Sequence, residues 1–289
     1  MTEITARDGI KLYAESQGPE TGAPIVFVHE LAGSCRAFDL QVKEWRSNWH
    51  CITFNARGYP PSGIPPSVDS YSQGHAAADI GAVLDGFGLK DAHIIGVSMG
   101  SASTLQFAIR HPERVRSITL TSIGSGSDMK PGEFAAGMEA LAVLALNKGM
   151  RALAEHYAAT PTRYRLKEKN PSEYKNFIDQ LGSGSALGIT NTMRGVQSQR
   201  PPLYAHKERI EGLHVPALVV LGEEDEPCVK PSHFLKETLP GARLEIVPKT
   251  GHCVNLEEPA LYNRLVIGFI EGIEARRRSA KGSGEDRYK

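Results

Sequence analysis

A serine held between two glycines is the first candidate for chemistry in this chain. The motif Gly-x-Ser-x-Gly, residues 96–100, follows the apolar run 93–97 and precedes the segment 101–111, whose apolar residues have helical spacing. A strand, a sharp turn and a helix in this order lift a serine hydroxyl clear of a sheet, and the glycines omit side chains that would collide there. Because the chain has 29 glycines, the inference depends on the strand and helix that flank the motif. We predict that Ser98 is a nucleophile.

A base must accompany this serine, because a hydroxyl is a weak nucleophile until a neighbouring group removes its proton. Among the ten histidines, His252 follows the apolar run 244–247, which has the composition of a buried strand. Parallel strands end at one edge of a sheet, where ligands bind, so His252 and Ser98 are expected at the same edge. We predict that His252 is the general base.

An acidic residue is also needed, to orient the histidine and to stabilise its charged form. Asp225 comes soon after the apolar run 216–221 and is therefore expected at the same edge of the sheet. Asp128, after the run 115–121, is a weaker candidate. The neighbouring acids of Asp225 remain alternatives, and these are Glu223, Glu224 and Glu226.

Predicted strands and helices alternate along most of the chain. This order predicts an α/β protein with a mostly parallel, doubly wound sheet and helices on both of its faces. The turn-forming pair Asp8-Gly9 predicts a hairpin at the start. The expected strands are 4–6, 10–14, 24–29, 51–54, 93–97, 115–121, 216–221 and 244–247, and the expected helices include 37–45, 76–87 and 260–276.

One long segment interrupts this alternation. Residues 127–213 contain no convincing strand, and their apolar residues recur at helical spacing. We predict that this segment is a helical cap over the carboxyl edge of the sheet, with the core formed by 1–126 and 214–275. The charged, Gly- and Ser-containing tail, 276–289, is expected to be disordered.

The composition narrows the classes of partner. The 33 basic and 33 acidic residues give a formal net charge of zero, so nothing favours binding to nucleic acid or to an anionic membrane. No secretory signal or membrane-spanning stretch is recognisable, and a cytoplasmic location is expected. The four cysteines have neither zinc-site nor disulfide spacing, so we expect no metal and no cofactor. The sequence leaves a homodimer open.

The chain resembles the α/β-hydrolase superfamily over about residues 4–273, particularly its serine carboxylesterase and enol-lactonase-like members with a helical cap. The resemblance rests on the serine motif, on Gly222-x-x-Asp225 and on Gly251-His252 with Glu257 and Pro259 behind it, in the order Ser, Asp, His that this fold uses. It implies a catalytic triad of Ser98, Asp225 and His252. It also implies that the backbone amides of Met99 and Leu31 bind the oxyanion, and that His29 braces the loop carrying Leu31.

Two residues depart from the pattern of the superfamily. Glu30 stands where relatives usually have glycine, one residue before the expected oxyanion donor. We expect its carboxylate to turn away and pair with a cation, with Arg57 as the candidate, although a role at the active-site wall stays open. Asn55 stands where relatives commonly have aspartate. Further residues of the active-site wall are expected to include His29 and, from the cap, Met138 and Tyr157.

The resemblance implies a serine hydrolase that cleaves a small carboxylic ester or lactone through an acyl-enzyme intermediate. Dehalogenases and epoxide hydrolases of this fold need a carboxylate where the chain has Ser98, so those reactions are excluded. A cofactor-free perhydrolase or a lyase using the same triad remains an alternative within enzymes. A non-catalytic hydrolase-like ligand receptor is the alternative outside them. The expected partner is a small-molecule ester or lactone.

Overall fold

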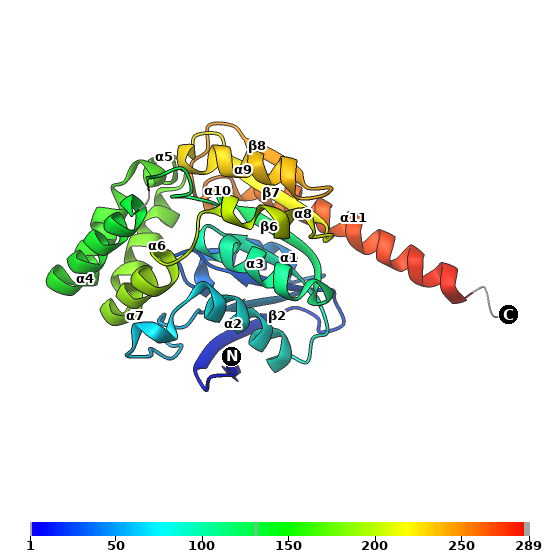
Figure 1. Cartoon of the computed structure of the whole chain (residues 1–289). Coiled ribbons are helices and arrows are strands. Elements are labelled where there is room, and N and C mark those ends of the chain that lie inside the picture. Colours follow the sequence, from blue (N-terminus) through cyan, green and yellow to red (C-terminus); the bar gives the residue numbers. More distant parts are fainter. Residues whose placement is uncertain (1, 131, 286–289) are drawn as a thin grey trace.

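The computed structural model describes residues 2–130 and 132–285 and contains an eight-stranded sheet (Figure 1). The strands lie in the order β1-β2-β4-β3-β5-β6-β7-β8. The β1–β2 and β2–β4 pairings are antiparallel and the other five are parallel, which confirms the mostly parallel sheet. The strands are β1 (Thr2–Thr5), β2 (Lys11–Gln17), β3 (Pro24–Val28), β4 (His50–Phe54), β5 (Ala92–Val97), β6 (Val115–Thr121), β7 (Ala217–Gly222) and β8 (Arg243–Val247).

Helices cover both faces of this sheet. Strands β3, β4, β5 and β7 are buried at every position, as their continuous apolar composition predicts for strands enclosed on two sides. One face packs against α2, α3 and α9, and the other against α1 and α11. The core helices are α1 (Asp39–Trp45), α2 (Gln73–Gly86), α3 (Met99–Arg110), α8 (Lys207–Glu211), α9 (Glu226–Thr238), α10 (Val254–Glu257) and α11 (Pro259–Glu285).

All regular structure that is described between β6 and β7 is helical, and in Figure 1 its helices α4–α7 gather at one end of the molecule. Asn170 begins one of them, because its side chain accepts a hydrogen bond from the Glu173 amide and Pro171 fits the first turn. The helices are α4 (Glu133–Ala158), α5 (Tyr164–Lys169), α6 (Pro171–Gly182) and α7 (Ala186–Asn191), followed by a π-helical turn (Thr192–Gln197). We call these segments, together with the 3₁₀ turn Pro161–Arg163 between α4 and α5, the cap.

Short 3₁₀ turns connect several elements. They are Cys35–Phe38, Val68–Ser70, Pro112–Arg114, Pro161–Arg163 and Leu203–His206. None of the helices among the described residues combines the length and the hydrophobicity that crossing a bilayer requires.

The sequence predicts a disordered tail from residue 276, and the structure describes residues 276–285 as part of helix α11. Helix α11 continues to Glu285 and extends away from the body of the molecule (Figure 1). Arginine, lysine and alanine are good helix formers, and a helix already packed against the sheet propagates easily. Arg277 also anchors this stretch through an ion pair of 2.7 Å with Asp91. Residues 286–289 lie outside the described part.

Candidate active site

Ser98 occupies a sharp turn between the end of β5 and the start of α3. Its backbone has φ 53° and ψ −113°, a conformation that is costly for a residue with a side chain. The turn brings neighbouring backbones so close that a Cβ on Gly100 would lie 2.0 Å from the Val28 carbonyl oxygen, and one on Gly96 would lie 2.5 Å from the Ser101 nitrogen. The glycines of the motif are therefore required by the geometry of the turn.

Two backbone amides beside this turn are available to a ligand. Met99 opens α3, where amide groups lack helical partners and the helix dipole favours negative charge. Leu31 lies in the loop after β3, next to Glu30. The structure assigns neither amide a hydrogen-bond acceptor among the described residues. Both residues predicted as oxyanion donors thus keep a free N–H group.

The loop carrying Leu31 is fixed from several sides. The Tyr59 hydroxyl donates to the Leu31 carbonyl oxygen at 2.7 Å. His29 donates from Nδ1 to the Glu30 carbonyl oxygen at 2.7 Å, and its Nε2 accepts from the Ala56 amide at 3.0 Å. Burial lowers the pKa of His29 to about 4, so the ring is neutral and its two nitrogens have separate roles. This geometry fits the bracing role expected of His29.

Asn55, which stands where relatives commonly have aspartate, also stabilises this region through its side-chain amide. Its side-chain oxygen accepts from the Cys35 amide at 2.7 Å, and its side-chain nitrogen donates to the Pro60 carbonyl oxygen at 2.7 Å. An aspartate would lack the donor for the second bond, so the amide suits this position.

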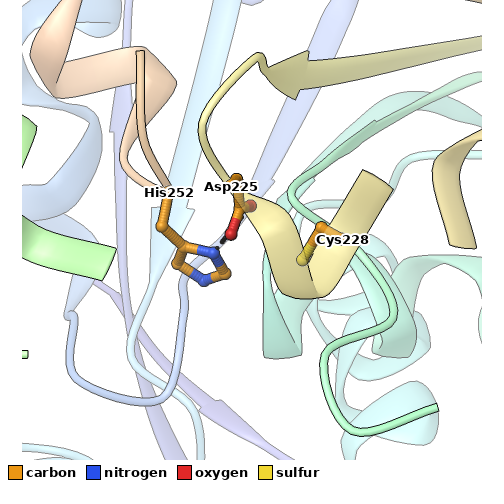
Figure 2. A group of neighbouring side chains, drawn as sticks. All are labelled: Asp225, Cys228 and His252. Atoms are coloured by element: carbon orange, nitrogen blue, oxygen red, sulfur yellow. Dashed lines mark hydrogen bonds and ion pairs between the residues drawn. The ribbon is translucent and has the colours of Figure 1, made fainter. Parts of the chain in front are cut away.

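His252 and Asp225 lie together on loops that follow β8 and β7. The ring donates from Nδ1 to Oδ2 of Asp225 at 2.8 Å, and both side chains are buried (Figure 2). Burial alone would raise the pKa of Asp225, but the charge and the hydrogen bond of His252 hold it below its ordinary value. The aspartate is therefore ionised at neutral pH, and Nε2 of His252 is the nitrogen left for proton transfer.

The His252 loop is held by a buried carboxylate to which the sequence had assigned no role. Glu257 accepts hydrogen bonds from the amides of Gly251, at 2.6 Å, and Cys253, at 2.9 Å, the residues on either side of His252. Ser122, which follows β6, donates from its hydroxyl to the His252 carbonyl oxygen at 2.8 Å. The spacing of six residues between Gly251 and Glu257 was visible in the sequence, whereas Ser122 carried no local signal.

Cys228 lies beside the histidine–aspartate pair, on the first turn of α9 (Figure 2). The ligand-type atoms of Asp225, Cys228 and His252 all lie within 4.8 Å of one another, a grouping that also occurs in metal sites. Burial and the charge of Asp225 raise the pKa of the Cys228 thiol well above its ordinary value. The protonated thiol is therefore an uncharged neighbour of the pair.

The alternative acids have other partners. Asp128 is exposed and accepts from the Tyr204 hydroxyl at 2.9 Å. Glu224 pairs with Arg165 of the cap at 2.6 Å. Among the described contacts, Asp225 is thus the acid that is hydrogen-bonded to His252.

The cation expected to pair with Glu30 was misassigned. Arg57 is bound on both sides by other carboxylates, Asp79 at 2.7 Å and Asp8 at 2.7 Å, which leaves no place for Glu30. Glu30 instead forms a buried ion pair with Arg163, at the end of a 3₁₀ turn in the cap. Nothing local in the sequence connects these two residues, which are 133 positions apart.

Met138 and Tyr157, the two cap residues expected at the active-site wall, both lie on α4. The rings of Tyr157 and Phe177 flank the Arg163 guanidinium, with centroids 5.2 Å and 4.9 Å from its central carbon. Met138 is partly buried and packs against the apolar cluster that contains the side chains of Leu31 and Met99. Cap residues and the side chains of Leu31 and Met99 thus belong to one apolar cluster.

A serine on a sharp turn after β5, together with a His–Asp pair from the loops after β7 and β8, defines a doubly wound α/β protein built around a nucleophile elbow. The family model for the alpha/beta hydrolase fold matches residues 23–259. The chain belongs to the α/β-hydrolase fold family.

Named relatives are similar over nearly the whole chain. A Bacillus subtilis protein provisionally named 2-succinyl-6-hydroxy-2,4-cyclohexadiene-1-carboxylate synthase is 28% identical over 93% of this chain and 98% of its own. The 3-oxoadipate enol-lactonase 1 of Acinetobacter baylyi is 25% identical over 94% and 97%, respectively. Among solved structures, an N-acyl homoserine lactone degrading enzyme is 27% identical, with a TM-score of 0.75 over 93% of this chain and 100% of its own. The enol-lactonase from Burkholderia xenovorans, 20% identical over 93% of this chain and 100% of its own with a TM-score of 0.82, shows the same fold.

Proposed function

We propose that the chain is a serine hydrolase that cleaves small carboxylic esters or lactones through an acyl-enzyme intermediate. The observation that carries the proposal is the pairing of Asp225 with Nδ1 of buried His252, at the same sheet edge as the strained turn of Ser98. Groups in this arrangement serve acyl transfer.

In the proposed reaction the Ser98 hydroxyl attacks the carbonyl carbon while Nε2 of His252 takes its proton. The tetrahedral oxyanion accepts hydrogen bonds from the amides of Leu31 and Met99, which hold no acceptor among the described residues. His252 then returns the proton to the leaving alkoxide, which departs as an alcohol, or as the free hydroxyl end of an opened lactone. Water, deprotonated by His252, attacks the acyl-serine and releases the carboxylic acid and Ser98.

The relatives support this class of substrate. Their names include an enol-lactonase, an N-acyl homoserine lactone degrading enzyme and the carboxylesterase YbfK of Bacillus subtilis. Their substrates are esters or lactones, in which one oxygen atom links the carbonyl carbon to the leaving group. The same proton transfer by His252 serves both.

Turnover of p-nitrophenyl acetate and butyrate tests the proposal. Ser98→Ala and His252→Ala should each lower kcat on the order of 10⁴- to 10⁶-fold without unfolding the protein. Ser101→Ala is a matched control on the same helix, because it removes a hydroxyl whose bond goes to the Thr121 carbonyl oxygen. A folded Ser98→Ala protein that keeps most of its activity would refute the assignment.

A second reaction class, a lyase using the same triad, is favoured by the similarity to the relative named as a synthase. A fluorophosphonate, which labels serine nucleophiles, tests the reactivity of Ser98 separately from the turnover of esters or lactones. Labelling at Ser98 with no turnover of esters or lactones would favour this second class. Ligand binding with neither labelling nor turnover would favour a non-catalytic receptor.

A further inference from the structure

Arg165, on helix α5 of the cap, contacts both loops that carry the His–Asp pair. It forms a bidentate ion pair with Glu224, from Nε to Oε2 and from Nη2 to Oε1, each at 2.6 Å. Glu224 directly precedes Asp225 in the loop after β7. Arg165 also lies against Gly251, the residue directly before His252, where a Cβ on the glycine would be 3.5 Å from the Cβ of Arg165. One cap side chain thus contacts the residues that precede both members of the pair.

The ion pair fixes geometry more than it supplies attraction. The hydrogen bonds of Arg165 hold the pKa of Glu224 below its ordinary value, so both partners are charged at neutral pH. The two side chains are 26% and 39% exposed, and solvent therefore screens their attraction. Two parallel N–H···O bonds nevertheless align the guanidinium with the carboxylate, which a single bond would not do. Glu168, on the same helix, also binds the guanidinium and helps to hold it in place.

Three parts of the molecule meet at Glu224. Its backbone amide donates to the Thr250 carbonyl oxygen at 2.9 Å, which joins the loop after β7 to the loop after β8. Its carboxylate binds Arg165, which joins both loops to the cap. Because Asp225 follows Glu224 directly, a displacement of Glu224 changes the approach of the Asp225 carboxylate to Nδ1 of His252.

We propose that Arg165 is a positioning residue for the His–Asp pair, which sets the approach of Asp225 to His252 through Glu224. The inference rests on the proposed hydrolysis, in which His252 transfers a proton. Arg165 acts through the residues that it touches and takes no part in the chemistry itself. Proton transfer needs its groups at hydrogen-bond distance, so a small misplacement of the pair slows the reaction. The seating of the cap and the geometry of the pair are thereby linked.

Steady-state kinetics with p-nitrophenyl butyrate tests this role. Arg165→Met keeps an unbranched aliphatic side chain but removes the guanidinium, and it should lower kcat about 3- to 30-fold with KM nearly unchanged. Glu224→Gln should have a similar effect and provides the same test from the core side. Because the two residues act through each other, the double variant should lie within about twofold of the slower single variant. Arg165→Lys, which keeps the charge but not the bidentate geometry, should lie between Arg165→Met and the wild type.

A second bidentate pair, within the cap, is the matched control. Arg194 binds Glu139 from Nε at 2.8 Å and from Nη2 at 2.6 Å, and this pair is also partly exposed. Arg194→Met should therefore leave kcat within about twofold of the wild-type value. Equal losses of kcat in Arg194→Met and Arg165→Met would overturn the proposal, because they would show a general effect of disturbing the cap. An unchanged kcat in a folded Arg165→Met protein would overturn it as well.

Proton NMR of the protein without substrate separates this proposal from the proposed hydrolysis. The Nδ1 proton of His252, hydrogen-bonded to Asp225, should give a resonance downfield of the amide protons that disappears in His252→Ala. Arg165→Met should shift this resonance, and Arg194→Met should not. A shift in a protein that turns over no ester or lactone would uphold the positioning of the pair and refute only the hydrolysis. Identical resonances in the wild type and in Arg165→Met would overturn the positioning role, even in an active esterase.

Discussion

Glu30, in the loop that carries Leu31, and Arg163 of the cap form an ion pair in which both side chains are almost fully buried. An isolated carboxylate beside Leu31 would oppose the negative charge that the loop is expected to bind. At about 6 Å and an effective dielectric constant of ~20, that opposition amounts to roughly 2–3 kcal/mol. Arg163 supplies the compensating charge, and it does so from the cap, so the position of the cap and the electrostatics of the loop depend on each other.

This pair predicts a strongly non-additive double mutant. Glu30→Gly should lower the free energy of unfolding by about 3–5 kcal/mol, because it leaves Arg163 buried without its partner. Arg163→Met should have a similar cost by stranding Glu30. The combined variant should be less destabilised than the sum of the two by at least about 2 kcal/mol, measured by urea denaturation.

The activity of the Glu30→Gly protein distinguishes pairing from chemistry. Because the pair is proposed to be electrostatically neutral toward the oxyanion, kcat for p-nitrophenyl butyrate should change less than about tenfold where the protein remains folded. A loss of a hundredfold or more at an unchanged melting temperature would instead give Glu30 a direct part in catalysis.

Asp225→Asn should lower kcat on the order of 10⁴-fold, less than the loss for Ser98→Ala, because the acid orients His252 and forms no bond to substrate. Asp128→Asn is the matched control, an exposed acid whose partner is the Tyr204 hydroxyl. Its effect should stay within about threefold. A larger effect of Asp128→Asn than of Asp225→Asn would show that the acid is misassigned.

His29 predicts a pH dependence of stability. Its pKa is about 4 in the folded protein and about 6.5 when unfolded, so between these values the unfolded chain binds more protons. The contribution of the neutral ring to the free energy of unfolding is therefore fully present above pH 6.5. It is lost as the pH falls, and the loss amounts to about 3 kcal/mol below pH 4. The lowered pKa of Asp225 acts in the same direction, but only below its ordinary value of 3.8.

Urea denaturation at pH 5 and pH 7 measures this dependence. The wild-type protein should lose stability between the two, and His29→Gln, although less stable overall, should show a smaller difference between them. Equal slopes in the two proteins would contradict the assignment of this window to His29. Burial also lowers the pKa values of His50, His93 and His206, but these groups are present in both proteins, so the difference between the two slopes reports His29.

The sequence predicts the position of site residues that follow strands, but it does not predict contacts between side chains that are distant in the chain. Ser98, Asp225 and His252 were predictable because each follows a strand, and the ends of parallel strands meet at one edge. The sharp turn at Ser98 was also predictable, because the two glycines of the motif indicate that neighbouring backbone segments lie too close for a Cβ atom. The Glu30–Arg163 pair was not, because Arg57 is nearer in sequence and no periodicity reports a contact between the loop and the cap.

The end of α11 gives a second example. Gly and Ser near the C-terminus suggested disorder, but the helix continues through Arg277, which is anchored to Asp91 by an ion pair. Composition averages over a segment and does not detect such a contact. The boundaries of helices are accordingly less predictable than their existence.

Glu257→Gln should impair catalysis through the position of His252. A glutamine offers one oxygen to the two amides that Glu257 now binds, and its NH₂ group would face the other N–H. We expect a loss of about 1–3 kcal/mol in stability and of about 10- to 100-fold in kcat, with KM nearly unchanged. Glu258→Gln, which weakens only an ion pair with Lys169, is the control and should leave kcat unaltered. A fall in stability without any fall in kcat would reduce Glu257 to a purely structural role.

The apolar cluster of the cap predicts a limit on the length of the acyl chain. Met138 packs against the cluster containing Leu31 and Met99, so a long chain would have to displace packed side chains. Among p-nitrophenyl esters, kcat/KM should be highest for short to medium chains and at least about tenfold lower for palmitate. Met138→Ala should raise the ratio of octanoate to butyrate turnover, because each additional buried methylene stabilises binding by about 0.8 kcal/mol. Leu146→Ala, at an exposed position of the same helix, should leave that ratio unchanged. Activity that rises sharply on emulsified long-chain triglyceride would show that the cap opens to lipid and that this limit does not exist.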